Sequence, residues 1–115
     1  VGLDYFSLAG MQNFMDTINR TNKKVGQLVN HRAEILGVLF TFFKMSTNHS
    51  KRIFDAISEL FGDKIFKTRI PENVRLKESQ EAAKSIFDFA PDSTSAVAYK
   101  EFTKELEERL SYVRN

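Results

Sequence analysis

An apolar run at residues 35–43, ILGVLFTFF, constrains the fold of this 115-residue chain more than any other feature of the sequence. The run does not alternate between apolar and polar residues, and charged residues bound it on both sides. Such a run, rich in β-branched and aromatic residues, is typical of a parallel strand that is covered on both faces. A short buried helix is the competing interpretation, and Gly37 favours the strand. The run is about half the length that crosses a bilayer.

The residues after this run predict a helix and then a second strand. Polar residues at 46–48 supply candidate caps for a helix of about fourteen residues, which Gly62 ends. The predicted buried stripe of this helix comprises Ile53, Phe54, Ile57, Leu60 and Phe61. Residues 64–70 then alternate, and Pro71 stops the strand because it lacks a backbone N–H and fixes its own φ. Strand, helix and strand with short connections predict a βαβ unit, whose two parallel strands lie at about 35–43 and 64–70.

Helices are expected on both sides of this unit. At residues 5–24, apolar residues recur every three or four positions, which predicts a helix with one face in the core. The basic segment at 22–32 indicates a frayed helix end and a linker, residues 76–86 a weaker helix, and the C-terminal segment a strong last helix. On that last helix, Glu105 and Arg109 predict an exposed pair on a solvated face. The fold class is therefore α/β with three to four helices. The first helix's apolar face comprises Leu8, Met11, Phe14, Met15 and Ile18.

Composition and missing motifs narrow the function. The chain is 42% hydrophobic and 28% charged, a globular composition, and its length allows one domain at most. A net charge of +2 does not by itself indicate nucleic-acid binding. Without cysteine there is no disulfide or cysteine-ligated zinc, and the sequence contains no GxxxxGK[ST] phosphate loop. His31 and His49 lack a matching carboxylate or nucleophile, so these residues assign no catalytic or metal site.

The turn after Pro71 is the most favourable place for a ligand, because ligands of open α/β sheets bind at the carboxyl ends of the strands. Basic residues gather near the same edge, beginning with Lys44 at the end of the first strand. An edge of this kind could meet the phosphates of a nucleotide or of DNA, whereas the competing interpretation is an ordinary solvated turn. The other basic residues are Lys51, Arg52, Arg75 and Lys77.

Several phrases occur in an order that resembles the C-terminal half of the ParA/Soj partition ATPases. The phrase ILGVLFTFFKMSTNHS at 35–50 resembles a family strand ending in GVLLTMYDxRTN, and FGDKIFKTRIPENVRLKES at 61–79 resembles FGDKVFxTxIPRNVRLxEAP. The helices YFSLAGMQNFMDTI at 5–18 and YKEFTKEL at 99–106 are similar to the family's YxALEGLxxLLxTI helix and to its last helix. The match runs from about Leu3 to Leu110, and its most specific part is the strand followed by Pro and Asn-Val-Arg-Leu.

This resemblance implies a doubly wound P-loop fold of the deviant Walker type, of which residues 1–115 form a single partial domain, the C-terminal half. Members of that family bind ATP with Mg²⁺, dimerise around it and bind DNA without sequence preference, and a ParB-like centromere-binding protein stimulates hydrolysis. It also implies plasmid or chromosome partitioning in the cytoplasm, on the nucleoid, with no membrane. The start at Val1 rather than methionine leads us to expect a fragment or a processed product. Lacking the phosphate loop, this chain should be inactive as an ATPase and bind ATP weakly when alone.

The same resemblance implies roles for residues near the nucleotide base. Pro71, Glu72 and Asn73 match the segment beside the adenine, and the strand end from Thr41 to Lys44 approaches the base. This chain would therefore supply part of the base pocket and none of the hydrolytic apparatus.

The resemblance is weaker for DNA binding. Ser46 and Glu72 stand where the family carries arginine, whereas Arg75 matches and Lys44 adds positive charge nearby. A stand-alone, nucleotide-free adaptor that binds DNA or a protein through the same partial fold is the alternative function. The residues predicted to bind DNA are Arg75, Lys77, Lys51 and Arg52.

Overall fold

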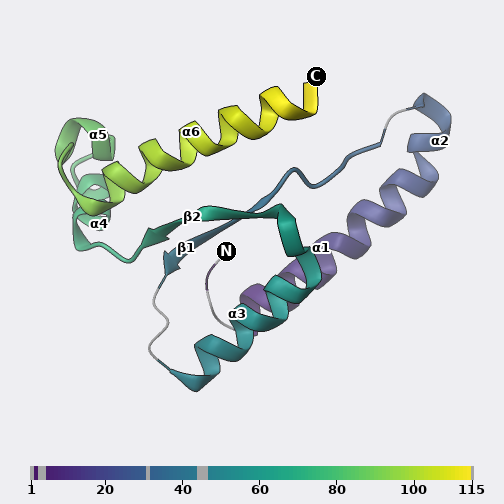
Figure 1. Cartoon of the computed structure of the whole chain (residues 1–115), viewed down its shortest axis with the longest axis horizontal. Helices are drawn as coiled ribbons and strands as arrows, with labels where there is room; N and C mark the ends of the chain where they lie inside the picture. The colour runs from purple at the N-terminus through teal and green to yellow at the C-terminus, as the bar shows by residue number, and fades with distance from the viewer. Residues whose placement is uncertain (1, 3–4, 31, 44–46, 115) are drawn as a thin grey trace.

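A parallel pair of strands lies at the centre of the structure, a computed structural model that describes residues 2, 5–30, 32–43 and 47–114. Strand β1 (Val38–Phe43) pairs with strand β2 (Ile65–Pro71), and helix α3 (Asn48–Phe61) with the short 3-10 helix η1 (Gly62–Lys64) joins them (Figure 1). The predicted βαβ unit is confirmed. Strand β1 begins three residues later than the apolar run.

Further helices surround this unit, so the described residues form six α-helices and the prediction of three to four was too low. The further helices are α1 (Tyr5–Lys24), α2 (Gly26–Val29), α4 (Val74–Glu81), α5 (Ile86–Phe89) and α6 (Thr94–Arg114). The prediction of a frayed helix end and linker at 22–32 was wrong in part, because α1 continues to Lys24 and α2 forms after it and ends at Asn30, whose φ of 54° is left-handed. The helices predicted at 5–24 and at the C-terminus are confirmed, and the α/β class with them.

The weaker helix expected at 76–86 is instead two helices, because the chain turns after α4. Ala83 adopts a φ of 54°, and the N–H groups of Ala83 and Lys84 donate to the carbonyls of Gln80 (3.1 Å) and Ser79 (3.0 Å). These two bonds are those of a Schellman motif, in which glycine usually occupies the left-handed position. Alanine at that position hides the helix end from sequence reasoning.

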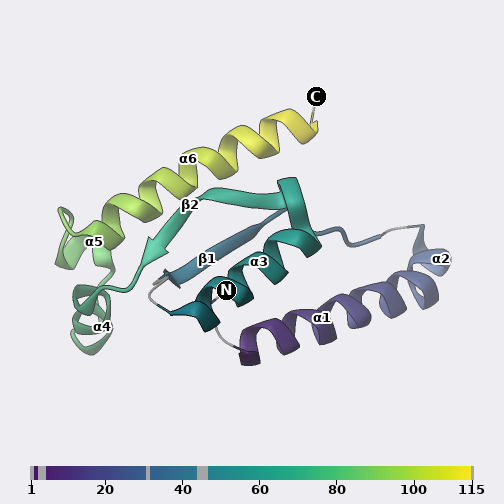
Figure 2. The same cartoon turned by 60° about the horizontal axis from the view of Figure 1, so that its bottom comes forward.

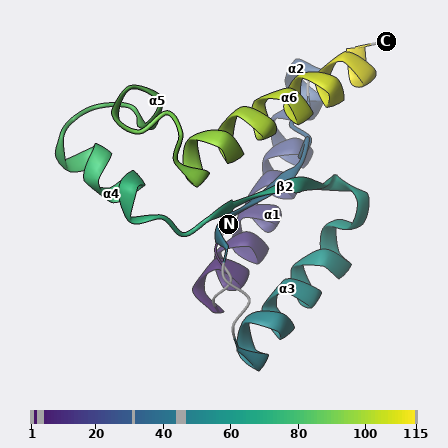
Figure 3. The same ribbon diagram turned by 60° about the vertical axis from the view of Figure 1, so that its left-hand side comes forward.

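Helices cover both faces of the sheet. Helix α6 lies over one face, and α3 and α1 lie over the other (Figures 2 and 3). On the α3 side, Val38 and Phe40 are buried against Ile53, Ile57 and Phe61 of α3, and α1 contributes partly buried side chains. The predicted covering of both faces is thus confirmed. The α1 residues packed on this cluster are Leu8, Met11 and Met15.

Two residues of the predicted apolar stripes lie outside this core. Phe14 of α1 is 60% exposed and Leu60 of α3 is 57% exposed, so their assignment to the core was wrong.

Helix α6 is joined to the sheet by polar contacts as well as by packing. The carboxylate of Glu105 accepts the backbone N–H groups of Lys67 (2.7 Å) and Thr68 (2.9 Å), two successive residues of β2. Successive N–H groups of a regular strand point to opposite edges, but here β2 is irregular. Two steps along β1, from Val38 to Phe40, oppose four steps along β2.

Arg109 provides a second polar contact, one helical turn further along α6. Its Nη1 donates to the carbonyls of Leu36 (3.1 Å) and Lys64 (2.7 Å), the residues just before the two strands begin. Its guanidinium lies 3.8 Å from the ring centroid of Phe66, and both groups occupy the space that a Cβ on Gly37 would need. The prediction of an exposed Glu105–Arg109 surface pair was therefore wrong.

The chain is extended for its length. Its radius of gyration is 16.5 Å, whereas a compact domain of this size has about 13 Å. Among the helices of the described residues, none is long and apolar enough to cross a membrane.

Candidate functional site

The carboxyl ends of β1 and β2 meet at one edge of the sheet, because the strands are parallel. Phe43 pairs with Pro71 in the strand register, which brings the segment containing Thr41 beside the loop that follows β2. Thr41 is half-buried in β1. Lys44 and Ser46, to which the sequence assigned roles, lie outside the described residues.

Asn73 holds the loop after β2 in place. As the N-cap of α4, its Oδ1 accepts the backbone N–H of Arg75 at 2.9 Å, and its Nδ2 donates to Oγ1 of Thr94 at 2.8 Å. The first bond starts α4, and the second ties the loop to the beginning of α6. The segment 71–73 is therefore fixed at both ends by backbone and side-chain geometry, which is what a preorganised binding loop requires.

Glu72 lies at the surface of this loop beside a lysine. Its Oε1 is 4.0 Å from Nζ of Lys77, and both side chains are about half exposed, at 51% and 63%. An exposed pair at this separation contributes little stability. The contact does, however, place a carboxylate next to a cation that the sequence assigned to DNA.

A hollow of about 590 Å³ opens beside Asn73, at the start of α6. Arg75 lies along it, with its guanidinium 5.7 Å from the ring centroid of Phe89 and 3.5 Å from the carboxylate of Glu78. A guanidinium, an aromatic ring and a helix N-terminus suit a planar or anionic group. Sequence reasoning missed the far wall of this hollow, although the polar run after Pro91 marked a helix start. That wall consists of Phe89, Ala90, Pro91, Asp92, Ser93 and Thr94.

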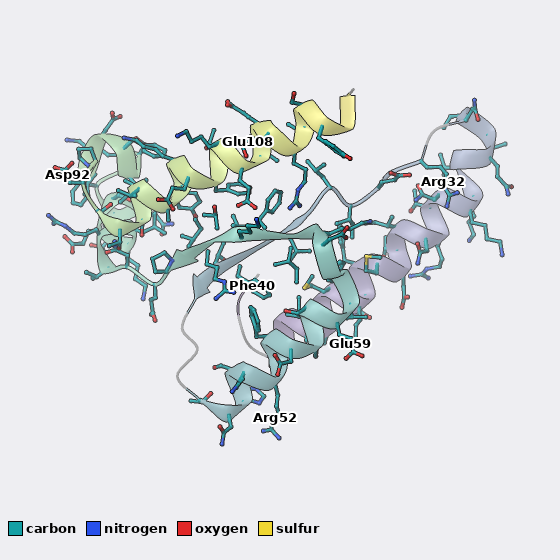
Figure 4. The ribbon with its side chains drawn as sticks, in the orientation of Figure 1. Arg32, Phe40, Arg52, Glu59, Asp92 and Glu108 are labelled. Atoms are coloured by element: carbon teal, nitrogen blue, oxygen red, sulfur yellow. The ribbon has the colours of Figure 1, made fainter. Side chains whose placement is uncertain are left out.

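The predicted DNA-binding cations occupy two separate helices. Lys51 and Arg52 are exposed in the first turns of α3, whereas Arg75 and Lys77 are exposed on α4. The start of α3 and helix α4 lie apart in Figures 1 and 3. Figure 4 shows Arg52 at the start of α3, well away from Asp92 beside α5.

The described residues contain no group of three or more His, Asp or Glu side chains that could hold a metal ion. His49 is exposed at the start of α3, and His31 lies outside the described residues.

Parallel strands joined by a helix, with helices on both faces, define a part of an α/β domain, and the fixed loop and the hollow lie where such domains commonly bind ligands. No established family profile matches the chain. It is, however, 32% identical to the chromosome-partitioning ATPase Soj of Thermus thermophilus over 96% of its own length and 43% of the relative's. It is also 32% identical to the sporulation initiation inhibitor protein Soj of Bacillus subtilis, over 92% of this chain and 40% of that protein.

A third relative, an uncharacterised protein of Mycobacterium tuberculosis, is 34% identical over 93% of this chain and 32% of its own length. The chain is therefore a homologue of Soj/ParA partitioning proteins and is similar to their C-terminal part. It spans less than half the length of these three relatives.

Proposed function

We propose that this chain is the C-terminal part of a ParA-like ATPase domain that acts in plasmid or chromosome partitioning. Its role there is to supply the adenine-side loop and a surface that binds DNA without sequence preference. The observation that carries the proposal is similarity to Soj proteins over 92–96% of the chain. A match of this length includes the βαβ unit and the helices that flank it.

The geometry of the carboxyl edge supports the nucleotide role. The register of the strands puts Thr41 and Pro71 near the same edge of the sheet. Asn73 fixes the loop that follows β2 by bonding Thr94 at the start of α6. Such an edge can hold a nucleotide base against backbone and amide groups. Phosphate and Mg²⁺ would be held by a phosphate loop, which this sequence does not contain, so ATP and Mg²⁺ belong to the longer protein.

A partial domain also explains the exposed apolar surface. A hollow of about 610 Å³ lies between α1, the segment before β1, and α6. Its walls are almost wholly apolar, and it includes Phe14, whose ring is 60% exposed. We assign this hollow to packing against the phosphate-binding part of the domain, which would extend the two strands into a doubly wound sheet. The other apolar side chains include Met11, Met15, Ile18, Phe102 and Leu106.

Calorimetry on the 115-residue chain tests the nucleotide role. Because the phosphate loop supplies most of the electrostatic attraction for ATP, we expect no saturable heat with Mg-ATP at millimolar concentration and no hydrolysis. Micromolar binding by the chain alone would contradict the proposed division of the site. In the longer protein, by contrast, Asn73→Ala should raise the Kd for ATP and leave DNA binding intact.

Fluorescence anisotropy with a random-sequence duplex tests the DNA role in the longer protein. Arg75→Glu and Lys51→Glu should each weaken binding and reduce the slope of log K against log salt by about 0.9 per phosphate contact. Lys104→Glu, an equal charge change on the exposed face of α6, serves as the control. If Arg75→Glu and Lys51→Glu behave like this control, the surface that binds DNA lies elsewhere.

A further inference from the structure

The end of the molecule opposite the α4–α5 end carries an exposed apolar patch. There α1 turns into the short helix α2, far from α4 and α5 (Figures 1 and 2). Leu28 is 84% exposed, Val29 57% and Val25 49%. Three neighbouring aliphatic side chains at such exposure are uncommon on a surface that contacts only water. We call residues 19–30 and 32–33 the α1–α2 tip.

Cations flank this patch. Between Thr17 and Ala33 the sequence contains four Lys and Arg residues and no Asp or Glu. Among the described residues, none of these four forms an ion pair. Figure 4 shows Arg32 at the chain segment that leaves α2. The tip is therefore positively charged although the whole chain has a net charge of only +2. The four cations are Arg20, Lys23, Lys24 and Arg32.

A hollow of about 650 Å³ lies within the tip and is lined mainly by carboxamides. Carboxamide groups offer both a donor and an acceptor, the pair that a peptide backbone requires. Lys23 and Arg32 lie at the same hollow, so it combines amide groups with positive charge. The amide side chains are Asn19, Gln27 and Asn30, together with Asn22, whose amide group bonds the backbone of Ala33.

Hydrogen bonds within the tip hold it in one shape. The Nδ2 of Asn22 donates to the carbonyl of Ala33 at 2.7 Å, and its Oδ1 accepts the N–H of Ala33 at 2.8 Å. This pair of hydrogen bonds joins α1 to the chain segment that follows α2, so the tip forms a closed loop. Asn30 ends α2 in the left-handed conformation. A preformed site loses less conformational entropy when it binds a partner.

We propose that the α1–α2 tip is a docking site for a protein segment that carries acidic and aliphatic side chains. Its acidic groups would face the four cations, its aliphatic groups would cover Leu28 and its neighbours, and its backbone would pair with the amides. Nucleic acid would satisfy the cations and leave the aliphatic patch in water. A flat bilayer would not enter the hollow. The site lies at the other end of the molecule from α4, so it is separate from the proposed nucleotide loop.

The test is a fluorescence anisotropy titration of the 115-residue chain with a labelled synthetic peptide in which pairs of glutamates alternate with pairs of leucines. We expect saturable binding at micromolar to submillimolar Kd. Leu28→Ser and Lys23→Glu should each raise the Kd at least fivefold. Val74→Ser replaces another exposed aliphatic side chain by serine on α4, and Lys104→Glu repeats the charge change on α6, so each should change the Kd less than twofold. Both tip substitutions are at exposed side chains, so circular dichroism should show an unchanged fold.

Three further ligands identify the occupant. A peptide with serine in place of leucine should bind at least fivefold more weakly. Any binding of a DNA duplex or of phosphatidylglycerol vesicles should be unchanged by Leu28→Ser. Absence of saturable binding of the glutamate–leucine peptide up to 1 mM would overturn the proposal. So would equal binding of the serine peptide, which would indicate charge alone. DNA or vesicle binding that Leu28→Ser abolishes would assign the tip to that ligand instead. None of these outcomes depends on Arg75 or on ATP.

Discussion

Glu105→Gln tests whether the carboxylate on α6 holds the irregular part of β2. The carboxylate accepts two N–H groups with two oxygens, whereas a glutamine side chain offers one oxygen, and its NH₂ group cannot accept the second bond. Lys67 is exposed, so water can satisfy its N–H, but Thr68 is half-buried. We expect the free energy of unfolding to fall by about 2 kcal/mol, from one unsatisfied half-buried N–H and one bond that is no longer charge-assisted.

The same substitution should change the pH dependence of stability. Burial raises the pKa of the Glu105 carboxyl, but the N–H groups of Lys67 and Thr68 act in the other direction. The Thr68 hydroxyl and the charge of Arg109 add to this effect, and the net result is a lowered pKa. A lowered folded-state pKa means that the carboxylate stabilises the fold fully above the ordinary pKa of glutamate. That contribution is lost as the pH falls through the lowered pKa of the folded state.

Urea unfolding followed by circular dichroism at several pH values measures both effects. The difference between the parent chain and Glu105→Gln should be constant near neutral pH and shrink in acid. Glu101→Gln and Glu108→Gln are matched controls on the same helix, because both carboxylates are exposed, and each should change stability by less than about 0.5 kcal/mol. A Glu105→Gln effect as small as the controls, or one that does not change in acid, would refute the structural role of this carboxylate.

Three other substitutions test local features of the fold. Gly37→Ala should destabilise the chain by about 1–3 kcal/mol in urea unfolding, because its methyl group would overlap the ring of Phe66; an effect below 0.5 kcal/mol would show that the ring moves freely. Ala83→Gly should stabilise by about 1 kcal/mol by relieving the left-handed φ, whereas Ala82→Gly, one residue earlier in a right-handed conformation, should not stabilise. Asn73→Ala should cost about 1 kcal/mol through loss of the N-cap, and hydrogen exchange should then rise in α4; unchanged exchange would argue against the cap.

The βαβ unit could be predicted because its signals are local. The apolar run around Phe40, the cap at Thr47 and the strand stop at Pro71 act on neighbouring residues. They therefore predict the same secondary structure whatever the distant contacts are. In the structure Oγ1 of Thr47 accepts the N–H of Ser50 at 3.0 Å, as a cap before α3 should. Pro71 closes β2, as its missing N–H requires. Part of the candidate site follows from the same logic, since Asn73 comes directly after that strand.

The partners of these residues could not be predicted, because they are far away in the chain. Thr94, which receives the amide hydrogen of Asn73, is 21 residues further on, and nothing in either residue's local pattern indicates the other. The hollow beside Arg75 likewise depends on where the start of α6 lies relative to α4. The end of α4 was missed for a different reason, namely that alanine occupies a conformation usually reserved for glycine.

By itself, the sequence determined the secondary structure around the strands and their parallel pairing, because periodicity, caps and strand stops are short-range properties. Its phrases, in their order along the chain, indicated the resemblance to Soj/ParA proteins. Only the tertiary structure decided what Glu105 and Arg109 do. A carboxylate and a guanidinium one turn apart on a helix look like a solvated pair, yet here they bond backbone groups 37 to 73 residues away. Which partner a long charged side chain finds depends on the packing of α6 against β2, and the spacing of residues along one helix carries no information about that packing.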